Sequence, residues 1–330
     1  QPATRPLLGR SPLWTPTEDS IARTNIGRAM NELDFASYGD FYAWSVAAPG
    51  PFWTYAVEKL AIQFSKPATE TVDLANGVEQ PNWLRDARLN IVDSCFQAGD
   101  ETVAVVERSS RGDRAITYSE LAALSGRVSI GLRQLGLTPG DAVAVFLPMT
   151  TEAIAIYLGI VRSGCSVVSI ADSFSAEQVA SRLRIGNARL VFTVRSIARG
   201  KKTIPVYQRV VDANGPATVV IEDAWDEKAS DGNGTETLTL REGDVGWTEF
   251  LPATTTPQHA PPPSISSASE QCAPDSAINI LFSSGTTGDP KAIAWDHTTA
   301  IKAAVDGYFH QDIQPGDVTA WPTNQGWMMG

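Results

Sequence analysis

The amino-acid sequence predicts an α/β fold in which βαβ units build a parallel sheet with helices on both faces. Two observations lead to this prediction. Short segments that are apolar throughout recur in residues 101–330, as in strands that are buried on both faces. Between them lie longer segments with one apolar helical face, joined by short turns. Ligands in such sheets bind where the carboxyl ends of the strands meet the loops.

Residues 1–100 are expected to form a helical segment that packs on this main domain. Thr15-Pro16-Thr17-Glu18 has the pattern of a capping box with proline at the first helical position, which predicts a helix from Pro16 to Leu33. Large rings crowd the stretch from Tyr38 to Leu60. A stacked cofactor is one interpretation, but aromatic side chains mostly supply packing volume, so we expect packed helices.

The predicted elements of the main domain follow in regular order from Glu101. Thr117-x-x-Glu120 and Ser175-x-x-Gln178 are capping boxes that begin two of the helices. Strands are predicted at Thr102–Val106, Ala142–Leu147, Ser166–Ile170 and Leu190–Val194. Helices are predicted from Thr117 to Gly136, from Thr151 to Arg162 with Ile154, Tyr157, Leu158 and Val161 inward, and from Ser175 to Ile185.

The later elements are interrupted by polar sequence. Residues 226–277 are expected to be a largely mobile insertion, because Asp226–Glu236 and Pro252–Pro274 lack apolar content. Between these two segments, Asp244–Leu251 predicts a short docked helix. Further strands are predicted at Ile278–Phe282 and Asp317–Trp321, with a helix through Ile301, Val305 and Phe309 between them.

Composition excludes several classes of protein. The chain has 330 residues, 43% of them hydrophobic and 19% charged, as in a globular protein of one large domain or two. The formal net charge of -11 argues against nonspecific nucleic-acid binding, which depends on lysine and arginine. No apolar run of about 18 residues occurs, so we expect no membrane span.

Cysteine and histidine give no sign of a metal centre. The cysteines lie far apart without CxxC spacing, so neither a disulfide framework nor a zinc site is predicted, and a reducing compartment fits. The histidines form no HxxxH or Ser-His-Asp arrangement, so none is assigned a catalytic role and no metal-binding residue is predicted. These residues are Cys95, Cys165, Cys272, His259, His297 and His310.

The segment Ser283-Ser284-Gly285-Thr286-Thr287-Gly288-Asp289-Pro290-Lys291 follows a buried strand. Its glycines allow backbone N–H groups to approach an anion, and its hydroxyls and amine suit a polyphosphate. It is not a Walker A loop, because Pro290 and Ala292 flank the lysine. On composition alone, a polar surface turn remains the alternative.

This string resembles the phosphate-binding signature of the adenylate-forming enzymes, the superfamily of acyl-CoA synthetases, luciferases and peptide-synthetase adenylation domains. Other stretches resemble the acetyl-CoA-synthetase-like branch and, within it, plant peroxisomal acyl-activating enzymes. They are Pro51-Phe52-Trp53 with Trp83, Leu89-Asn90-Ile91, Gly140–Val145, and the closing Trp321–Gly330 with Gly326-Trp327.

The resemblance implies an acyl-CoA synthetase that uses ATP, Mg²⁺, CoA and a carboxylic acid. It places the ATP phosphates at Ser283, Ser284, Gly285, Thr286, Thr287, Gly288 and Lys291, of which Thr286, Thr287 and Lys291 are expected to be catalytic. It places the CoA phosphates at Arg199 and Lys202, and the acid at Trp327, Met328 and Met329. The methionines stand where small residues line an acetate-sized pocket, which favours another acid, although core packing explains them equally well.

The resemblance also sets expectations for the whole protein. Residues 101–330 correspond to part of the AMP-binding α/β domain, so we expect the chain to be an N-terminal piece that lacks the C-terminal domain and is inactive alone. A peroxisomal location is implied by resemblance only; otherwise the cytoplasm is expected. Two alternatives stay open: an enzyme that passes its acyl group to a carrier protein, and a noncatalytic scaffold, which Asn324 in place of the usual aspartate would fit.

Overall fold

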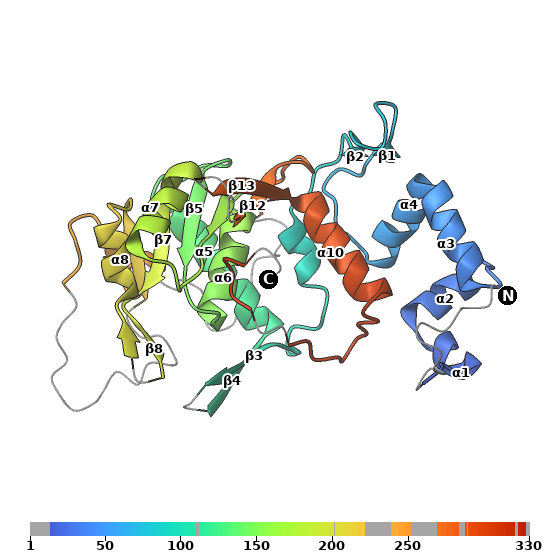
Figure 1. Cartoon of the computed structure of the whole chain (residues 1–330), viewed down its shortest axis with the longest axis horizontal. Coiled ribbons are helices and arrows are strands. Elements are labelled where there is room, and N and C mark those ends of the chain that lie inside the picture. The colour runs from blue at the N-terminus through green and yellow to red at the C-terminus, as the bar shows by residue number, and fades with distance from the viewer. Residues whose placement is uncertain are drawn as a thin grey trace. The chain divides into compact units, whose positions relative to one another are not determined.

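The structure is a computed structural model, which describes residues 14–109, 112–200, 202–221, 239–252, 269–283, 288, 290–320 and 323–327. The chain divides into two compact units. Unit 1 comprises residues 1–60 and 301–319, and unit 2 comprises residues 61–300 and 320–330. Figure 1 shows their elements in chain order. The predicted loop Asp226–Glu236 and most of Pro252–Pro274 lie outside the described residues.

The described residues of the N-terminal part of unit 1, from residue 14 on, form four helices: α1 (Glu18–Ala22), α2 (Asn25–Glu32), α3 (Tyr38–Ala47) and α4 (Pro49–Lys59). The prediction of one helix from Pro16 to Leu33 is wrong, because Thr24 divides it. The Thr24 hydroxyl donates to the Ile21 carbonyl at 2.7 Å and accepts from the Gly27 N–H at 3.0 Å. A side chain that bonds to the nearby backbone competes with the helix, so α1 ends and α2 begins at this residue.

The aromatic side chains of unit 1 pack against one another, whereas the predicted packing of this segment on the main domain stays a prediction. The ring centroids of Phe41 and Phe52 lie 6.3 Å apart. Phe309, at the end of α10 (His297–Phe309), lies 6.3 Å from Phe41 and 5.9 Å from Phe52. Such contacts between large rings add to the stability that their burial supplies.

Unit 2 is built on a seven-stranded sheet of order β11-β10-β7-β5-β6-β12-β13. Neighbouring strands pair in parallel, except that β12 and β13 are antiparallel. The predicted strands at Ala142, Ser166, Leu190 and Ile278 are confirmed. In sheet order the bounds are Val245–Gly246, Thr218–Ile221, Ala188–Val194, Ala142–Phe146, Ser166–Ser169, Ala277–Ser283 and Lys291–Asp296.

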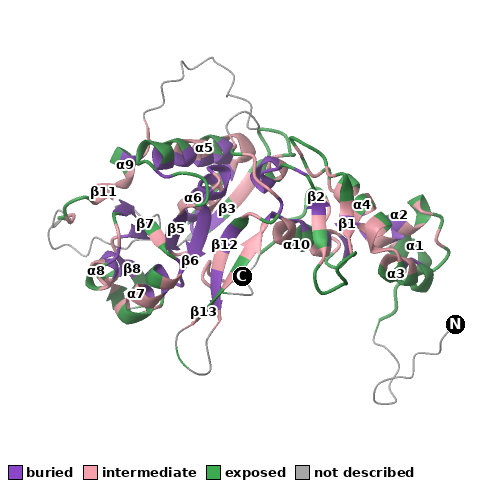
Figure 2. Cartoon of the chain, turned by 90° about the horizontal axis from the view of Figure 1, so that it is seen from above, coloured by how far each residue is buried: buried purple, intermediate pink, exposed green. Residues whose placement is uncertain are grey.

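Helices cover both faces of this sheet, with α5, α6 and α9 on one side and α7 and α8 on the other (Figure 2). The strands between them are the most buried part of unit 2, and β5 and β6 are buried along their whole length. The capping boxes predicted at Thr117 and Ser175 are present. The one predicted at Thr15 is wrong, because the N-cap of α1 is Thr17, whose side chain accepts from the Ser20 N–H. The bounds are α5 Tyr118–Gln134, α6 Thr151–Arg162, α7 Ala176–Ile185, α8 Val206–Asp212 and α9 Trp247–Phe250.

The predicted inward face of α6 is only partly right. Ala153, Ile156 and Ile160 are fully buried, whereas Ile154 and Leu158 are partly buried and pack on a cluster around Leu121. Because α6 contacts α5 as well as β5 and β6, it buries two faces. A helix in that position is apolar over most of its circumference, so a single stripe does not describe it.

Shorter hairpins flank the central sheet. β1 (Glu70–Asp73) pairs with β2 (Asn82–Arg85), β3 (Val103–Ser109) with β4 (Gly112–Thr117), and β8 (Ile197–Arg199) with β9 (Lys202–Ile204), all antiparallel. A 3₁₀ helix covers Ile91–Cys95. The strand predicted from Thr102 therefore belongs to a hairpin and not to the central sheet.

The strand predicted at Asp317–Trp321 is wrong over its described residues, 317–320, which form no strand. The Asp317 N–H donates to the Gln314 carbonyl at 3.0 Å, and the Asp317 carboxylate accepts from the Gln314 N–H at 2.8 Å. These bonds close a turn around Gly316, whose φ is +95°. An Asp side chain that bonds to the nearby backbone favours a turn over an extended strand.

Candidate active site

The Ser/Thr/Gly-rich segment is the loop of a β-hairpin at the carboxyl end of β12. The loop leaves the sheet after Ser283 and returns at Lys291, and these two residues are register partners. Ser283 is half-buried and Lys291 is exposed. A hydroxyl and a cationic amine therefore lie across the base of the loop from each other.

Within the loop, Gly288 is described and has φ of +149°, in a region that favours glycine. The predicted ATP contacts at Ser284, Gly285, Thr286 and Thr287 lie outside the described residues, so they stay predictions. The loop leads into the antiparallel strand β13, whereas a Walker A loop leads into a helix. Sequence reasoning missed β13, although Ala292-Ile293-Ala294-Trp295 has the apolar and aromatic content of a strand.

The predicted acid-binding turn, residues 324–327, lies against the end of β6. A Cβ atom placed on Gly326 would be 2.0 Å from the nitrogen of Ala171, so only glycine fits. Asn324 closes the turn, because its side-chain oxygen accepts from the Gly326 N–H at 3.1 Å and its carbonyl accepts from the Trp327 N–H at 3.1 Å. Trp327 is 60% exposed. Met328 and Met329 lie outside the described residues.

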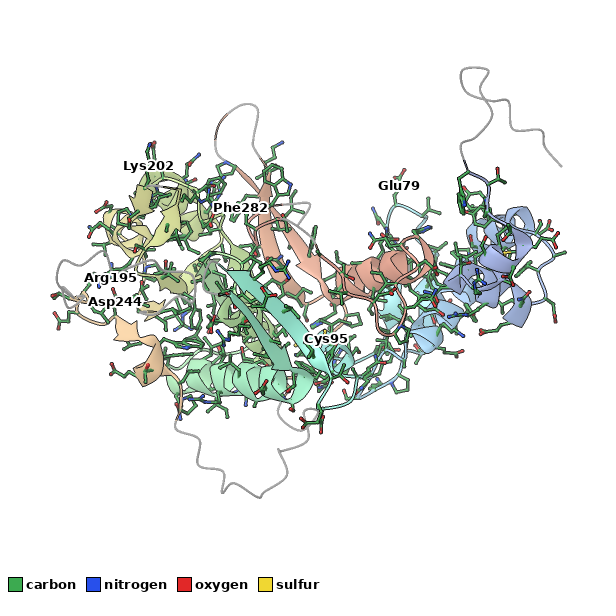
Figure 3. The ribbon with its side chains drawn as sticks, turned by 90° about the horizontal axis from the view of Figure 1, so that it is seen from below. Glu79, Cys95, Arg195, Lys202, Asp244 and Phe282 are labelled. Carbon is green, nitrogen blue, oxygen red and sulfur yellow. The ribbon has the colours of Figure 1, made fainter. Side chains whose placement is uncertain are left out.

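The predicted CoA-binding pair occupies a separate hairpin. Arg199 in β8 and Lys202 in β9 are register partners, and Gly200 between them has φ of +63°. Lys202 is exposed at the surface of unit 2 (Figure 3). Arg199 is bound to Asp172 by an ion pair of 2.6 Å. Sequence reasoning missed Asp172, although it comes just after a predicted strand end, where ligands gather in α/β sheets.

Arginine side chains surround the segment that follows β6. The Arg182 guanidinium lies 3.9 Å from the ring centroid of Phe174 and 5.5 Å from that of Phe282, which directly precedes Ser283. Burial lowers the pKa of Arg182, which is 8% exposed. Arg209 donates to the Phe174 carbonyl at 2.8 Å. With Arg199 these cations outnumber the one carboxylate that this segment carries, and a positive region of this kind attracts anions.

Burial moves the pKa values of His297 and Cys272 away from neutral pH. His297 is 1% exposed, its Nδ1 accepts from the Ile91 N–H at 3.2 Å, and burial lowers its pKa to about 4. Cys95, Cys165 and Cys272 are unpaired, and burial raises the pKa of Cys272 to about 11. The His297 ring therefore stays neutral near pH 7 and acts as an acceptor for the backbone.

Two further findings concern the described part of the chain alone. It contains no group of three or more His, Cys, Asp or Glu side chains placed to hold a metal ion. None of its helices is both long and apolar enough to cross a bilayer.

An α/β sheet that carries a Ser/Thr/Gly-rich hairpin loop, with guanidinium groups near the same edge, fits the class of adenylate-forming enzymes. The chain belongs to the AMP-binding enzyme family, which matches residues 93–330. Residues 38–95 match the acetyl-coenzyme A synthetase N-terminus. The resemblance predicted from the sequence is confirmed.

Curated relatives and a solved structure agree with this assignment. The chain is 37% identical to the hexanoyl-CoA synthase of Cannabis sativa, covering 97% of this chain and 46% of the relative. It is 36% identical to the probable acyl-activating enzyme 18, peroxisomal, of Arabidopsis thaliana, covering 96% and 45%. The acetoacetyl-CoA synthetase structure from Streptomyces lividans matches with a TM-score of 0.81 and 25% identity, covering 97% and 49%. The chain thus spans about half the length of the relatives it matches.

Proposed function

We propose that this chain forms part of an acyl-CoA synthetase, an AMP-forming acid–CoA ligase. The observation that carries the proposal is the placement of Ser283 and Lys291 across the base of a glycine-containing hairpin loop at the carboxyl edge of the sheet. The family match and the names of the relatives support the same activity.

In the proposed first step, a carboxylate oxygen of the acid attacks the α-phosphorus of ATP, forming an acyl-adenylate and releasing pyrophosphate. The carboxylate is ionised near pH 7, so no general base is needed. The loop hydroxyls of Ser283, Ser284, Thr286 and Thr287 and the Lys291 amine would stabilise the charge that accumulates on the β- and γ-phosphates. Mg²⁺ prefers phosphate oxygens and water as ligands, so the nucleotide would supply most of its coordination.

In the second step, the CoA sulfur attacks the acyl carbonyl carbon and AMP leaves, giving the thioester. We assign the CoA phosphates to Arg199 and Lys202, which are adjacent across the β8–β9 hairpin. An enzyme that transfers its acyl group to a carrier protein would need no such site. Dependence of product formation on CoA therefore separates the two functions.

The acid is proposed to be larger than acetate. Met328 and Met329 follow the turn at the end of β6, and methionine provides a long, adaptable wall for a pocket. One relative is named a hexanoyl-CoA synthase. A series of straight-chain acids tests this assignment, because a preference for acetate would contradict it.

The organisation and location of the protein are also proposals. Residues 1–100 would pack as a helical segment on the AMP-binding domain of residues 101–330. The name of the Arabidopsis thaliana relative supports a peroxisomal location. Colocalisation of the fluorescently labelled protein with a peroxisomal marker tests that location, and an even cytoplasmic signal would contradict it.

Acid-dependent ATP/pyrophosphate exchange, followed by detection of the CoA thioester, tests the proposed activity. The assay uses a protein that carries this chain together with the second half that its relatives have. We expect exchange and thioester formation with a preferred acid. Exchange without thioester would favour a carrier protein as acceptor, and no exchange with any acid would favour a noncatalytic scaffold.

Replacement of one loop hydroxyl tests the role of the loop. We expect Thr287→Val to slow exchange by about 30- to 900-fold, because removal of one donor to a developing anion costs about 2–4 kcal/mol. Thr102→Val, at an exposed residue outside the site, is the matched control and should leave exchange unchanged. Equal rates in both variants would remove Thr287 from the mechanism.

A further inference from the structure

Asp172 is a buried carboxylate that the proposed reaction does not yet use. It lies three residues beyond Ser169, the last residue of β6, and its side chain is 7% exposed. The Arg199 Nη2 atom lies 2.6 Å from its Oδ1 atom. Within the described part of the chain this is the only ion pair of either residue. Because a buried carboxylate without a partner is strongly unfavourable, the pair is expected to persist.

We propose that Asp172 is a positioning residue that holds the Arg199 guanidinium in place for a phosphate group of the thiol substrate. The proposal rests on the acid–CoA ligase function given above. A guanidinium has five N–H donors in a rigid fork, and one bond to Asp172 leaves most of them free. Since the Arg199 side chain is 50% exposed, those donors can reach a solvent-borne anion.

Arg199 and Lys202 of the hairpin then have different roles. Lys202 is exposed, and no carboxylate of the described residues lies within ion-pair distance of its amine. A lysine amine is a mobile point charge, whereas a fixed guanidinium recognises two phosphate oxygens in a defined orientation. Arg199 is therefore an oriented group and Lys202 a mobile charge.

The segment that carries Asp172 is itself held from several directions. Arg209 donates to the carbonyls of Asp172 and Phe174, at 3.4 and 2.8 Å. The Ile170 N–H donates to the Val145 carbonyl of β5 at 3.0 Å. The turn at Gly326 lies against Ala171. Asp172 thus has a fixed position between the predicted acid-binding turn and the basic hairpin.

Substitution of Asp172 separates orientation from charge, because the two effects have opposite signs. Asp172→Asn keeps the shape of the side chain, replaces the ion pair with Arg199 by at most a weaker neutral hydrogen bond, and raises the local positive charge by one unit. If orientation dominates, the KM for CoA rises; if Asp172 only neutralises charge, that KM falls. We expect a rise of about fivefold or more, because a charge-assisted bond that fixes the fork is lost.

The experiment measures the KM for CoA of thioester formation, together with CoA-independent ATP/pyrophosphate exchange, in the complete enzyme. Four proteins are compared: unsubstituted, Asp172→Asn, Arg199→Gln, and the double variant. Asp172→Asn should raise the KM for CoA and leave exchange within about twofold of the unsubstituted rate. In the Arg199→Gln background, Asp172→Asn should have no further effect on that KM, because Asp172 acts through Arg199.

An unchanged or lowered KM for CoA in Asp172→Asn would overturn the proposal, as would an equal rise in both backgrounds. If Arg199→Gln alone unfolds because it leaves Asp172 unpaired, the double variant, which has no buried charge, supplies the Arg199-free reference. In that case the KM for CoA of Asp172→Asn is compared with that of the double variant. A value at least as high as that of the double variant supports the role of Asp172. An unsubstituted enzyme without acid-dependent exchange would instead overturn the proposed function, which is a different result.

Discussion

The backbone of Gly326 lies directly against that of Ala171. A Cβ atom at Gly326 would be 2.0 Å from the Ala171 nitrogen and 2.5 Å from the Ile170 carbonyl carbon, distances that no pair of nonbonded atoms tolerates. Because Gly326 has no side chain, residues 324–327 can approach the end of β6. The segment that carries Asp172 begins at this same end of the strand. This contact explains why glycine precedes Trp327.

We expect Gly326→Ala to lower acid-dependent exchange about tenfold or more, because displacing a substrate-positioning turn by about 1 Å costs on the order of 10²-fold in rate. Residues 323–326 are only half-buried, so the melting temperature should fall by only a few degrees. Gly99→Ala is the matched control, since its Cβ would lie 3.5 Å from the Thr102 hydroxyl, an ordinary contact. Full exchange activity in Gly326→Ala would mean that the turn does not position the acid.

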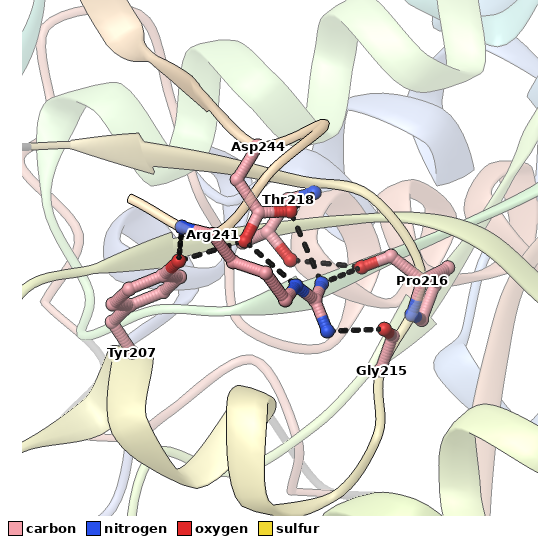
Figure 4. Close-up of polar contacts among 6 residues, drawn as sticks. All are labelled: Tyr207, Gly215, Pro216, Thr218, Arg241 and Asp244. Carbon is pink, nitrogen blue, oxygen red and sulfur yellow. Dashed lines mark hydrogen bonds and ion pairs between the residues drawn. The ribbon is translucent and has the colours of Figure 1, made fainter. Parts of the chain in front are cut away.

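Asp244 holds the segment that directly precedes β11. Its carboxylate, fully buried, accepts from the Tyr207 hydroxyl at 2.7 Å, the Thr218 N–H at 2.8 Å and two nitrogens of Arg241 at 3.1 Å (Figure 4). These bonds join α8, the start of β10 and the segment before β11. Such a carboxylate satisfies several donors at once, so its loss leaves all of them unpaired.

We expect Asp244→Ala to lower the free energy of unfolding by about 3 kcal/mol, as for breaking one side of a buried ion pair. Tyr207→Phe, which removes one hydrogen bond, should cost about 1 kcal/mol. Urea unfolding monitored by circular dichroism measures both. The exposed pair Arg108–Asp113 supplies the control, because Asp113→Asn should leave stability unchanged. Similar losses for Asp244→Ala and Tyr207→Phe would contradict the central role of the carboxylate.

Gly159 sets the distance between α5 and α6. A Cβ atom at this position would lie 2.6 Å from the Cγ1 atom of Val128, which alanine lacks, and 2.8 Å from the Ser125 carbonyl oxygen. We expect Gly159→Ala to destabilise the protein by about 1–3 kcal/mol through overpacking. Val128→Ala should relieve part of this loss, so the double variant should be at least about 0.5 kcal/mol more stable than additivity predicts. Strict additivity of the two changes would show that the helices do not meet at these residues.

The parts of the fold that sequence predicted correctly depend on local interactions. The capping boxes at Thr117 and Ser175 involve residues three apart, and the buried strands β5 and β6 carry apolar side chains throughout. Strands whose identity depends on a distant partner were missed, as β13 and β4 show. At Asp317–Trp321 a strand was predicted where its described residues form none. The cause is the same, because an apolar sequence becomes a strand only where a neighbouring strand pairs with it.

The residues of the candidate site also fall into two groups, those that contiguous sequence predicts and those that it does not. Ser283, Lys291, Arg199 and Lys202 were predicted because the resemblance rests on contiguous strings. Asp172, Arg182 and Arg209 were not, because their meeting depends on how α7, α8 and the β8–β9 hairpin pack at the end of β6. Neither charge patterning nor helical periodicity indicates which arginine faces that edge. The packing between distant segments determines which arginine side chains reach the end of β6.

His297 predicts a pH dependence of stability. Burial at 1% exposure lowers its pKa from 6.5 to about 4, so the folded protein keeps the ring neutral where the unfolded chain takes up a proton. A group with a depressed folded pKa stabilises fully above the unfolded pKa and loses that stabilisation as the pH falls toward the folded pKa.

The free energy of unfolding should therefore lose about 1.4 kcal/mol per pH unit from this residue as the pH falls from about 6 to about 4. His297→Gln should be less stable at neutral pH, since an acceptor for the Ile91 N–H is displaced, but its stability should fall less steeply over that range. Urea unfolding at several pH values measures the two slopes, with the exposed His310→Gln as control. Parallel slopes for the unsubstituted protein and His297→Gln would show that His297 is not the group that titrates.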